Sequence, residues 1–311
     1  MLRHIPVLLA EAIDSLNIKP DGIYVDLTLG RGGHSGEILR RIPCGHLYAF
    51  DKDEEAIKQS TANLKDFDNK TIIRDDFRNF KRQLESLGVN KVDGILMDLG
   101  VSSPQFDDGE RGFSYKEDAR LDMRMDTRQS LDAYKVINTY SLEELTRVFR
   151  EYGEEKFSYQ IAKRIVKERE KEPIETTTQL VNIIKAVKPN KELIKKGHPA
   201  KQVFQALRIE VNDELGALQV ALKDGLEMLN ANGRLVVISF HSLEDRIVKN
   251  AFNSVSKVEG SRRLVFNLPS KEDEPKYRLV NNKVIIASDI EMEKNPRSKS
   301  AKLRAIERSR L

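Results

Sequence analysis

Short apolar runs alternate with amphipathic helical patterns over the first hundred residues, and this alternation limits the possible folds more than any other feature. The runs lie at residues 23–26, 46–51, 71–76 and 92–99. Strands separated by helices of about ten residues pair in parallel, through right-handed crossovers. The pattern therefore predicts an α/β fold with a doubly wound parallel sheet.

The alternation stops after residue 106. The next ninety or so residues contain no convincing buried strand and show three helical patterns, for which Ser141 and Thr177 or Thr178 are candidate N-caps. The α/β pattern then resumes with one long helix or two, followed by strand-like runs; these segments are residues 202–229, 234–240, 283–290 and 302–308. We predict a discontinuous domain of residues 1–106 and 200–311, with an inserted helical domain of residues 107–199.

The composition sets limits on location and partners. The chain has 311 residues with 53 basic and 49 acidic side chains, a net charge of +4 that permits a nucleic-acid partner without requiring one. No apolar run approaches the roughly 18 residues of a membrane span, and the N-terminus does not read as a signal peptide. The single cysteine, Cys44, fits a reducing, cytoplasmic setting, and the histidine spacing predicts no metal site. The sequence leaves open whether the protein is a monomer or a homodimer.

A glycine-rich turn follows the first predicted strand and precedes a helical pattern. It contains Gly30, Gly32 and Gly33, and such turns let the backbone approach a ligand closely. The spacing is Gly-x-Gly-Gly, which differs from the Gly-x-Gly-x-x-Gly of a dinucleotide fingerprint. Asp26 lies at the end of the strand, where a carboxylate would repel a pyrophosphate but suits an ammonium group.

Acidic residues end each of the first four predicted strands: Asp26, Asp51, Asp75 with Asp76, and Asp98. Ligands of doubly wound sheets bind at these strand ends, and an acid about 20 residues past the glycine turn usually takes ribose hydroxyls. Asp51 has that spacing, and Phe77 is placed to flank an adenine ring. A nicotinamide cofactor and S-adenosylmethionine both fit the ribose acid, and Asp26 favours the second. The alternative is that these acids cap helices.

The end of the fourth strand carries the residues expected to act on the substrate. Asp98 could accept a hydrogen bond from an exocyclic amine of a base, which would make that weak nucleophile more reactive. Ser102, Ser103 and Gln105 follow it as further polar contacts. Methylation of a pyrimidine carbon would need a thiol in this loop, and Cys44 instead precedes the second strand.

Two histidines and several basic segments remain to be assigned. His241 follows the strand at 234–240 and is either a structural residue or an acid–base group, and His34 closes the glycine turn. Residues 121–126, LDMRMD, form a buried loop edge or direct Arg120 and Arg124 at a substrate. Lysine and arginine are frequent in the insertion, as a solvated helix face or as phosphate contacts; they are Lys163, Arg164, Lys167, Arg169, Lys185, Lys188, Lys191, Lys195, Lys196 and Lys201.

Taken together, these motifs resemble a known family, the bacterial small-subunit ribosomal RNA cytosine-N4 methyltransferases of the MraW type. The resemblance covers nearly the whole chain in order and rests on HIPVLLAEAI, DGIYVDLTLGRGGHS, AFDKD, DGILMDLGVSSPQFDDGERGFSY, LDMRMD, YGEEKFSYQIAKRIV, HPAKQVFQALRIEVNDEL, GRLVVISFHSLEDRIVK and NPRSKSAKLRAIE. It implies a Rossmann-like S-adenosylmethionine-dependent methyltransferase sheet with an inserted all-α domain.

The resemblance also implies an activity and its site. The activity is N4-methylation of one cytidine in the decoding region of 16S ribosomal RNA, on an assembled or nearly assembled small subunit. The implied cofactor contacts are Gly32, Gly33, His34, Asp51, Phe77, Asp98 and Gln105. The SSPQF segment stands where many amino-methyltransferases carry a Pro-Pro motif. Asp98 therefore contacts either cytosine or the cofactor, and in the second case Ser102, Ser103 or His241 is left near the target.

Three other functions compete with this prediction. They are a nicotinamide oxidoreductase of similar fold, a non-catalytic ribosome-assembly factor that binds RNA through the insertion, and methylation of a ribose 2′-oxygen. The last would need a group that activates a hydroxyl, and no lysine lies in the loop after the fourth strand.

Overall fold

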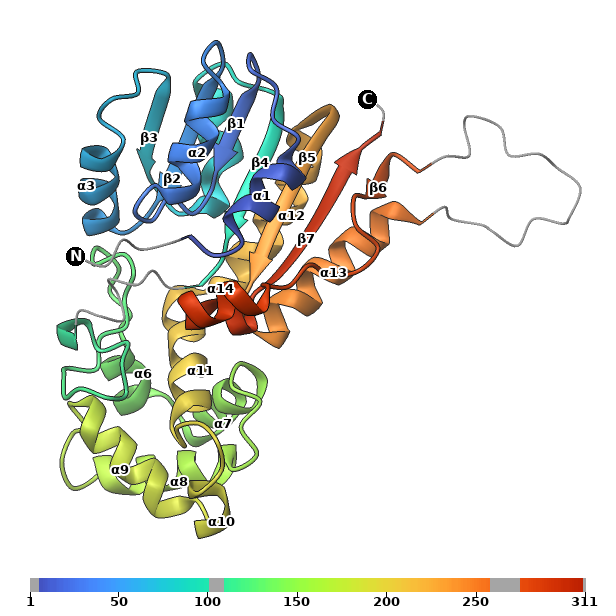
Figure 1. The fold of residues 1–311 in the computed structure, drawn as a ribbon. Helices are drawn as coiled ribbons and strands as arrows, with labels where there is room; N and C mark the ends of the chain where they lie inside the picture. Colours follow the sequence, from blue (N-terminus) through green and yellow to red (C-terminus); the bar gives the residue numbers. More distant parts are fainter. Residues whose placement is uncertain (1–5, 101–108, 258–274, 310–311) are drawn as a thin grey trace, which may run out of the picture. The chain divides into compact units, whose positions relative to one another are not determined.

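The computed structural model describes residues 6–100, 109–257 and 275–309. The chain forms two compact units (Figure 1). The sheet unit comprises residues 1–100 and 216–311, and the helical unit comprises residues 101–215.

The sheet unit contains one seven-stranded sheet in the order β3-β2-β1-β4-β5-β7-β6. Its strands are β1 (Ile23–Asp26), β2 (His46–Asp51), β3 (Lys70–Arg74), β4 (Val92–Asp98), β5 (Leu229–Ser239), β6 (Tyr277–Leu279) and β7 (Lys302–Arg308). The first five strands run parallel, and β7 is antiparallel to both of its neighbours, β5 and β6. Since parallel strands end at the same edge, the carboxyl ends of β1 to β5 together form one rim of the sheet.

Alternating side chains of each strand enter opposite cores, as expected for a sheet buried on both faces. Tyr24 of β1 and Leu96 of β4 belong to one core, whereas the adjacent Val25 and Ile95 belong to the other. The first core is covered by α1 (Leu9–Leu16) and α2 (Gly33–Arg41), with contributions from α3 (Glu54–Asn63) and α14 (Asp289–Lys294). The second is covered by α4 (Phe80–Ser86), α12 (Glu214–Met228) and α13 (Ser242–Ser256).

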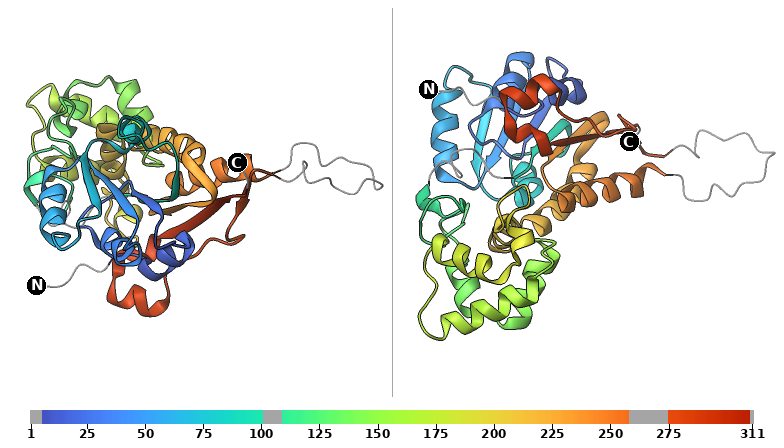
Figure 2. Two further views of the ribbon diagram at one scale, coloured as in Figure 1. Left: turned by 90° about the horizontal axis from the view of Figure 1, so that it is seen from above. Right: turned by 60° about the horizontal axis from the view of Figure 1, so that its bottom comes forward.

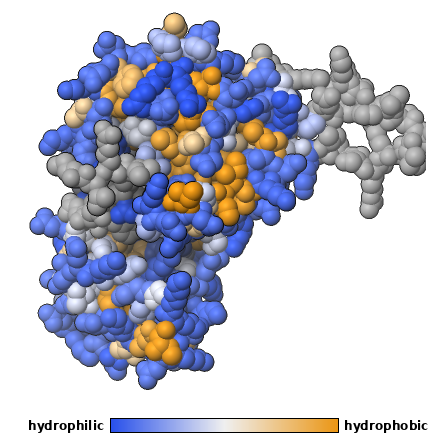
Figure 3. Space-filling model, viewed as in Figure 1, coloured by the Kyte–Doolittle hydropathy of each residue, from blue (hydrophilic) through white to orange (hydrophobic). Residues whose placement is uncertain are grey.

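The N-terminal and C-terminal segments of the sheet unit lie together. Figure 2 shows α1 and α14 side by side, and the backbone N–H of Leu8 donates to Oε1 of Glu291 at 2.8 Å. In Figure 3 hydrophobic residues gather near α14 and the start of β7, where Ile286 and Ile290 are 62% and 66% exposed. Apolar side chains on the surface are common in water-soluble folds, and no further role is assigned to them.

The C-terminal region shows where the predicted elements were wrong. Residues 283–290 do not form a strand, because only Ile285 makes a bridge, with Leu303, and the segment then turns into α14. The short β6 was not predicted, since three residues carry too little pattern. The helical stretch at 202–229 is two helices, which part at Asp213 with a left-handed φ of 46°.

The helical unit has its own core and, among its described residues, no strand beyond an isolated bridge between Arg120 and Thr176. Its elements are η2 (Gly109–Arg111), α6 (Ala133–Thr139), α7 (Leu142–Glu151), α8 (Ser158–Arg169), α9 (Thr177–Val187), α10 (Asn190–Leu193) and α11 (Lys201–Asn212). Ser141 caps α7 as predicted, and Thr176 caps α9, one residue before the predicted position.

The boundaries of this unit differ from the predicted insertion of residues 107–199. The sequence pattern assigns residues 200–215 to the sheet domain, but α11 packs against α6 and α7. Its Phe204 and Leu207 are part of the helical core, so α11 belongs to the helical unit.

Candidate functional site

The glycine turn after β1 is organised by Asp26. This carboxyl is buried and accepts hydrogen bonds from the backbone N–H of Thr28 at 3.0 Å and from Oγ of Ser35 at 2.6 Å. Burial raises the pKa of Asp26, which its hydrogen bonds oppose. The sequence alone did not single out Thr28 or Ser35. Asp26 thus ties the turn to α2, and each of its oxygens can still accept a further hydrogen bond from a ligand.

The glycines serve this turn in different ways. Gly32, with a φ of 79°, ends the turn as the N-cap of α2, a backbone conformation that favours glycine. A Cβ on Gly33 would lie 2.3 Å from Cγ of Pro6, so no larger residue fits without a shift of the N-terminal segment. The turn therefore presents bare backbone at the start of a nine-residue helix.

Asp51 ties the turn to the end of β2. Its Oδ2 accepts the backbone N–H of Gly30 at 2.9 Å, and its Oδ1 accepts that of Asp53 at 2.9 Å. Burial raises the pKa of this carboxyl to about 6, although the two backbone hydrogen bonds oppose the shift. A carboxylate oxygen accepts more than one hydrogen bond, so both oxygens can still receive hydroxyl donors from a ligand.

Asp98 at the end of β4 has a buried polar atom without a hydrogen-bond partner among the described residues. Its backbone N–H donates to Oγ1 of Thr28 at 2.6 Å, and its Oδ2 lies 3.6 Å from Nδ1 of His34. Its Oδ1 is buried and has no hydrogen-bond partner within the described parts of the chain. Burial, followed by the charges of Asp26 and Glu244, raises the pKa of Asp98 well above its usual value. A buried acceptor left open in this way is a position at which a ligand can donate a hydrogen bond.

His34 and His241 are both held by other groups. Nε2 of His34 lies 3.1 Å from the carbonyl oxygen of Val7. His241 is the N-cap of α13; its buried Nε2 lies 3.1 Å from Oε1 of Glu244 but makes no hydrogen bond within the described residues. Glu244 in turn accepts the backbone N–H of Phe240 at 2.8 Å. We had not singled out Glu244, although its position three residues after the cap is the spacing of a capping box.

The end of β3 is occupied by an ion-pair cluster. Asp76 accepts the backbone N–H of Arg78 at 3.0 Å and pairs with Nζ of Lys52 at 3.2 Å. Burial would raise the pKa of Asp76, but Lys52 and Arg78 outweigh it and hold the pKa below its usual value. Asp76 is thus engaged within the chain, and the half-buried Phe77 beside it remains the candidate for flanking an adenine ring.

Some predicted site residues are not placed. Ser102, Ser103 and Gln105 lie outside the described residues. Cys44 is exposed and precedes β2, at the opposite end of that strand from Asp51. This position agrees with the prediction that it takes no part in the site.

The acids of the rim fit a cationic ligand. Asp26, Asp51 and Asp98 are close to one another in the sheet, and burial raises the pKa of each. Such a group of carboxyls is stabilised when positive charge is placed beside it. The ammonium and sulfonium of S-adenosylmethionine supply that charge, and its ribose supplies hydroxyl donors for Asp51. The residues present therefore fit this cofactor.

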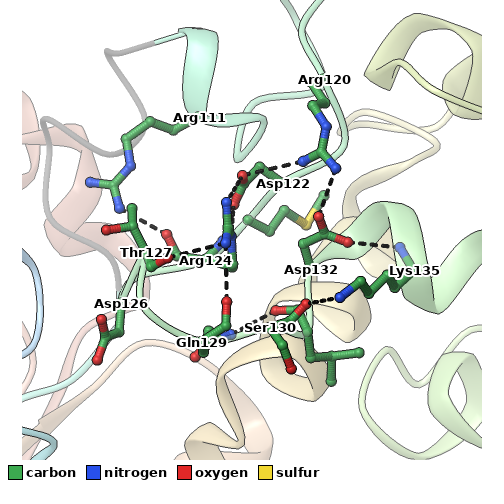
Figure 4. Close-up of polar contacts among 12 residues, drawn as sticks. Arg111, Arg120, Asp122, Arg124, Asp126, Thr127, Gln129, Ser130, Asp132 and Lys135 are labelled. Carbon is green, nitrogen blue, oxygen red and sulfur yellow. Dashed lines mark hydrogen bonds and ion pairs between the residues drawn. The ribbon is translucent and has the colours of Figure 1, made fainter.

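In the helical unit, residues 121–126 form an internal brace (Figure 4). Arg124 donates to both carboxylate oxygens of Asp122, at 2.8 and 2.7 Å, and to the carbonyl oxygens of Thr127 and Gln129. Arg120 pairs with Asp132 at 2.8 Å. Leu121, Met123 and Met125 are buried, as expected for a buried loop edge, whereas Arg120 is 52% exposed and a contact of the arginines with a substrate remains a prediction.

The described residues contain no group of three or more His, Cys, Asp or Glu side chains arranged to hold a metal ion. Among the described helices none is both long and apolar enough to cross a membrane.

The sheet unit is the Rossmann-like sheet of S-adenosylmethionine-dependent methyltransferases, as predicted from the sequence. The model of the MraW methylase family matches residues 1–309, and the chain belongs to this family. As a member it is a methyltransferase that uses S-adenosylmethionine. Membership removes the nicotinamide oxidoreductase from the alternatives.

Solved structures with low sequence identity have a loosely similar arrangement. A Streptococcus mutans protein in complex with SAH is 12% identical with a TM-score of 0.43, over 98% of this chain and 99% of that one. A ribosomal RNA methylase from Streptococcus thermophilus is 12% identical with a TM-score of 0.37, over 97% and 92%. Fibrillarin from Aeropyrum pernix, with bound S-adenosyl-L-methionine, is 9% identical with a TM-score of 0.41, over 96% and 73%.

Proposed function

We propose that this protein transfers a methyl group to N4 of one cytidine in the decoding region of 16S ribosomal RNA, in the small ribosomal subunit. The observation that carries the proposal is the buried, unpartnered Oδ1 of Asp98 at the rim of the sheet. An exocyclic amine is a donor that meets this acceptor. Membership of the MraW methylase family supports the methyl transfer, and the setting we propose is the cytoplasm.

The methyl donor would be held by the rim of the sheet unit. We assign ribose binding to Asp51, backbone contacts to Gly32 and Gly33, and adenine flanking to Phe77. His34 remains a predicted cofactor contact; its Nε2 lies beside the carbonyl oxygen of Val7, and its Nδ1 is 3.6 Å from the Asp98 carboxylate. Gln105 remains a predicted cofactor contact, and Asp26 would act by holding the turn.

Asp98 would activate the target amine. S-adenosylmethionine supplies an electrophilic methyl group. The lone pair of the cytosine amine is delocalised into the ring, and a hydrogen bond from its N–H to Asp98 returns electron density to the nitrogen. When the nitrogen gains the methyl group it must lose a proton, and Oδ1 of Asp98 is the acceptor within the site. A carboxyl whose pKa is raised by burial holds that proton better than an exposed aspartate does.

His241 is a weaker candidate for this role. Its ring caps α13 and lies beside the buried Glu244, so a structural role accounts for its position. Ser102 and Ser103 remain predicted contacts to the cytosine. The target base would have to be unstacked from its neighbours to reach the rim, and we propose that the helical unit helps to hold the surrounding RNA.

Transfer of labelled methyl groups tests this function. The protein is incubated with labelled S-adenosylmethionine and small subunits that lack the modification, beside the Asp98→Asn variant. We expect label in the 16S RNA of the wild-type reaction. The variant should bind S-adenosylhomocysteine but lose roughly 100-fold or more in turnover, since general-base groups contribute about 10²–10⁴-fold. Label on ribosomal protein, or an Asp98→Asn variant with full turnover, would contradict the proposal.

A further inference from the structure

Two segments of the helical unit that are distant in sequence meet at one aromatic pair. The ring of Tyr115, in the loop after η2, stacks on the ring of His198, with centroids 4.3 Å apart and an interplanar angle of 8°. Phe204 of α11 meets the same tyrosine edge-on, with centroids 5.8 Å apart. This packing fixes the plane of the His198 ring.

Three lysines act on the charge of His198. The pKa of His198 is lowered, first by partial burial and then by the charges of Lys185, Lys116 and Lys188. Lys185 and Lys188 come from the end of α9, and Lys116 comes from the loop that carries Tyr115. No acidic group is among the causes of the shift. The imidazole is therefore held neutral, which preserves one N–H donor and one acceptor on the ring.

The hydrogen bonding of His198 identifies its free donor. Nδ1 accepts the backbone N–H of Ala200 at 3.3 Å. The proton of the neutral ring therefore belongs on Nε2, and no described residue provides an acceptor for it. Nε2 is also accessible, because it is not one of the described atoms that are both buried and without a hydrogen-bond partner.

The three lysines differ in how they are used. Lys188 is buried and pairs with Glu155 at 2.6 Å, so its charge is neutralised inside the unit. Lys116 and Lys185 are exposed, and within the described chain neither has an ion-pair partner. Lys185 in the last turn of α9 also complements the helix dipole, but Lys116 lies in a loop and gains nothing from it.

We propose that Lys116, Lys185 and the Nε2–H of His198 form a phosphate-binding site that takes a backbone phosphate of the RNA substrate. The site offers two ammonium groups and one directed N–H donor, which match the several acceptor oxygens of a phosphate. Tyr115 is a positioning residue, because it holds the imidazole by stacking. The inference rests on the proposed function, which supplies an RNA substrate, and it assigns the helical unit a specific part in binding it.

Salt dependence of RNA binding tests the site. The full-length double variant Lys116→Gln/Lys185→Gln is compared with wild type for binding to a decoding-region RNA fragment between 50 and 300 mM salt, roughly the range in which phosphate contacts are resolved. Loss of one phosphate contact should reduce the slope of log K against log salt by roughly 0.7–0.9. It should weaken binding on the order of tenfold at low salt. Binding of S-adenosylhomocysteine and thermal stability should not change.

A matched control removes the same charge elsewhere in the unit. Lys163 and Lys167 of α8 are exposed, have no ion pair among the described residues, and do not act on His198. Lys167 also lies in the last turn of its helix, as Lys185 does. The variant Lys163→Gln/Lys167→Gln should leave the salt slope close to that of wild type.

A second readout follows His198 directly. NMR titration of the histidine ring should show its pKa rising when RNA binds, since a phosphate beside the ring favours the charged form. An equal slope in wild type and Lys116→Gln/Lys185→Gln, or an equal loss in the α8 control, would overturn the site. The site would also be overturned if polyglutamate competed for binding as well as an RNA of equal charge does. A wild-type protein that binds RNA through this site but transfers no methyl group to it would instead contradict the proposed function alone.

Discussion

The affinity for S-adenosylhomocysteine should depend on pH through Asp51. The pKa of this carboxyl is about 6, against an ordinary value of 3.8. To accept hydrogen bonds from two ribose hydroxyls it must be ionised. Between pH 8 and 6.5 the affinity should therefore be nearly constant. Below about pH 6 the dissociation constant should rise toward tenfold per pH unit, because one proton must be lost for each ligand bound.

The raised pKa of Asp51 also makes the stability of the unliganded protein depend on pH. This stability falls as the pH rises, whereas the affinity for S-adenosylhomocysteine increases. The raised pKa corresponds to 6 − 3.8, or about 2.2 units, and at about 1.36 kcal/mol per unit it is worth up to about 3 kcal/mol. This stability is fully present below pH 3.8, where Asp51 is protonated in both states, and it is lost as the pH rises through about 6. The increase in melting temperature caused by S-adenosylhomocysteine should thus grow between pH 3.8 and about 6, where the stability contributed by Asp51 is lost.

Calorimetric titrations from pH 5 to 8, with wild type and Asp51→Asn, measure these effects. The variant should bind about 10- to 150-fold more weakly at pH 7.5, the equivalent of the 1.5–3 kcal/mol of a charge-assisted hydrogen bond, and its affinity should not change near pH 6. Asp14→Asn, at an exposed carboxyl of α1, is the control, and it should keep the inflection near pH 6. A wild-type affinity that is constant from pH 5 to 7.5, or an Asp51→Asn variant with the wild-type profile, would refute this account of Asp51.

Three further changes test the packing around the two units. Lys188→Met should destabilise the protein by about 3–5 kcal/mol in urea unfolding, because it leaves Glu155 charged and buried; the double variant with Glu155→Leu should recover much of the loss. Asn212→Ala should cost about 1–3 kcal/mol in the same assay, since the side chain donates to the buried carbonyl of Met123 at 2.8 Å. His241→Asn should keep both methyl transfer and melting temperature, because asparagine also caps helices, whereas His241→Ala should lose about 1 kcal/mol; a His241→Asn variant that folds but is inactive would show a catalytic role.

The sheet could be read from the sequence because its signals are local. The strand at residues 46–51 was predicted with its observed bounds, and the glycine turn was placed between the observed β1 and α2. Apolar runs and glycine spacing depend on the backbone nearby, so they survive without knowledge of tertiary contacts. The boundary at residue 215 could not be read, since a helical pattern runs through it and only the left-handed Asp213 interrupts the helix.

The site was only partly visible from the sequence, because partners come from distant segments. The sequence identifies Asp26, Asp51 and Asp98 as residues at strand ends, but only their hydrogen bonds in the structure distinguish their roles. Asp26 is satisfied by its own turn, whereas Oδ1 of Asp98 is left open among the described residues. Lys188 was grouped with surface lysines, yet it is buried against Glu155 from 33 residues away. Composition gives the charge of such residues, and only the fold shows whether that charge is available to a partner.

The central claim is the identity of the methylated atom, and mass spectrometry of nucleosides from reacted small subunits tests it most directly. Digested RNA is separated against standards for N4-methylcytidine, 5-methylcytidine and 2′-O-methylcytidine, and the modified fragment is mapped. We predict N4-methylcytidine at a single position in the decoding region, absent from reactions with Asp98→Asn. A methyl group on a base carbon, on ribose or on another base would contradict the assignment of Asp98 as the acceptor for the cytosine amine.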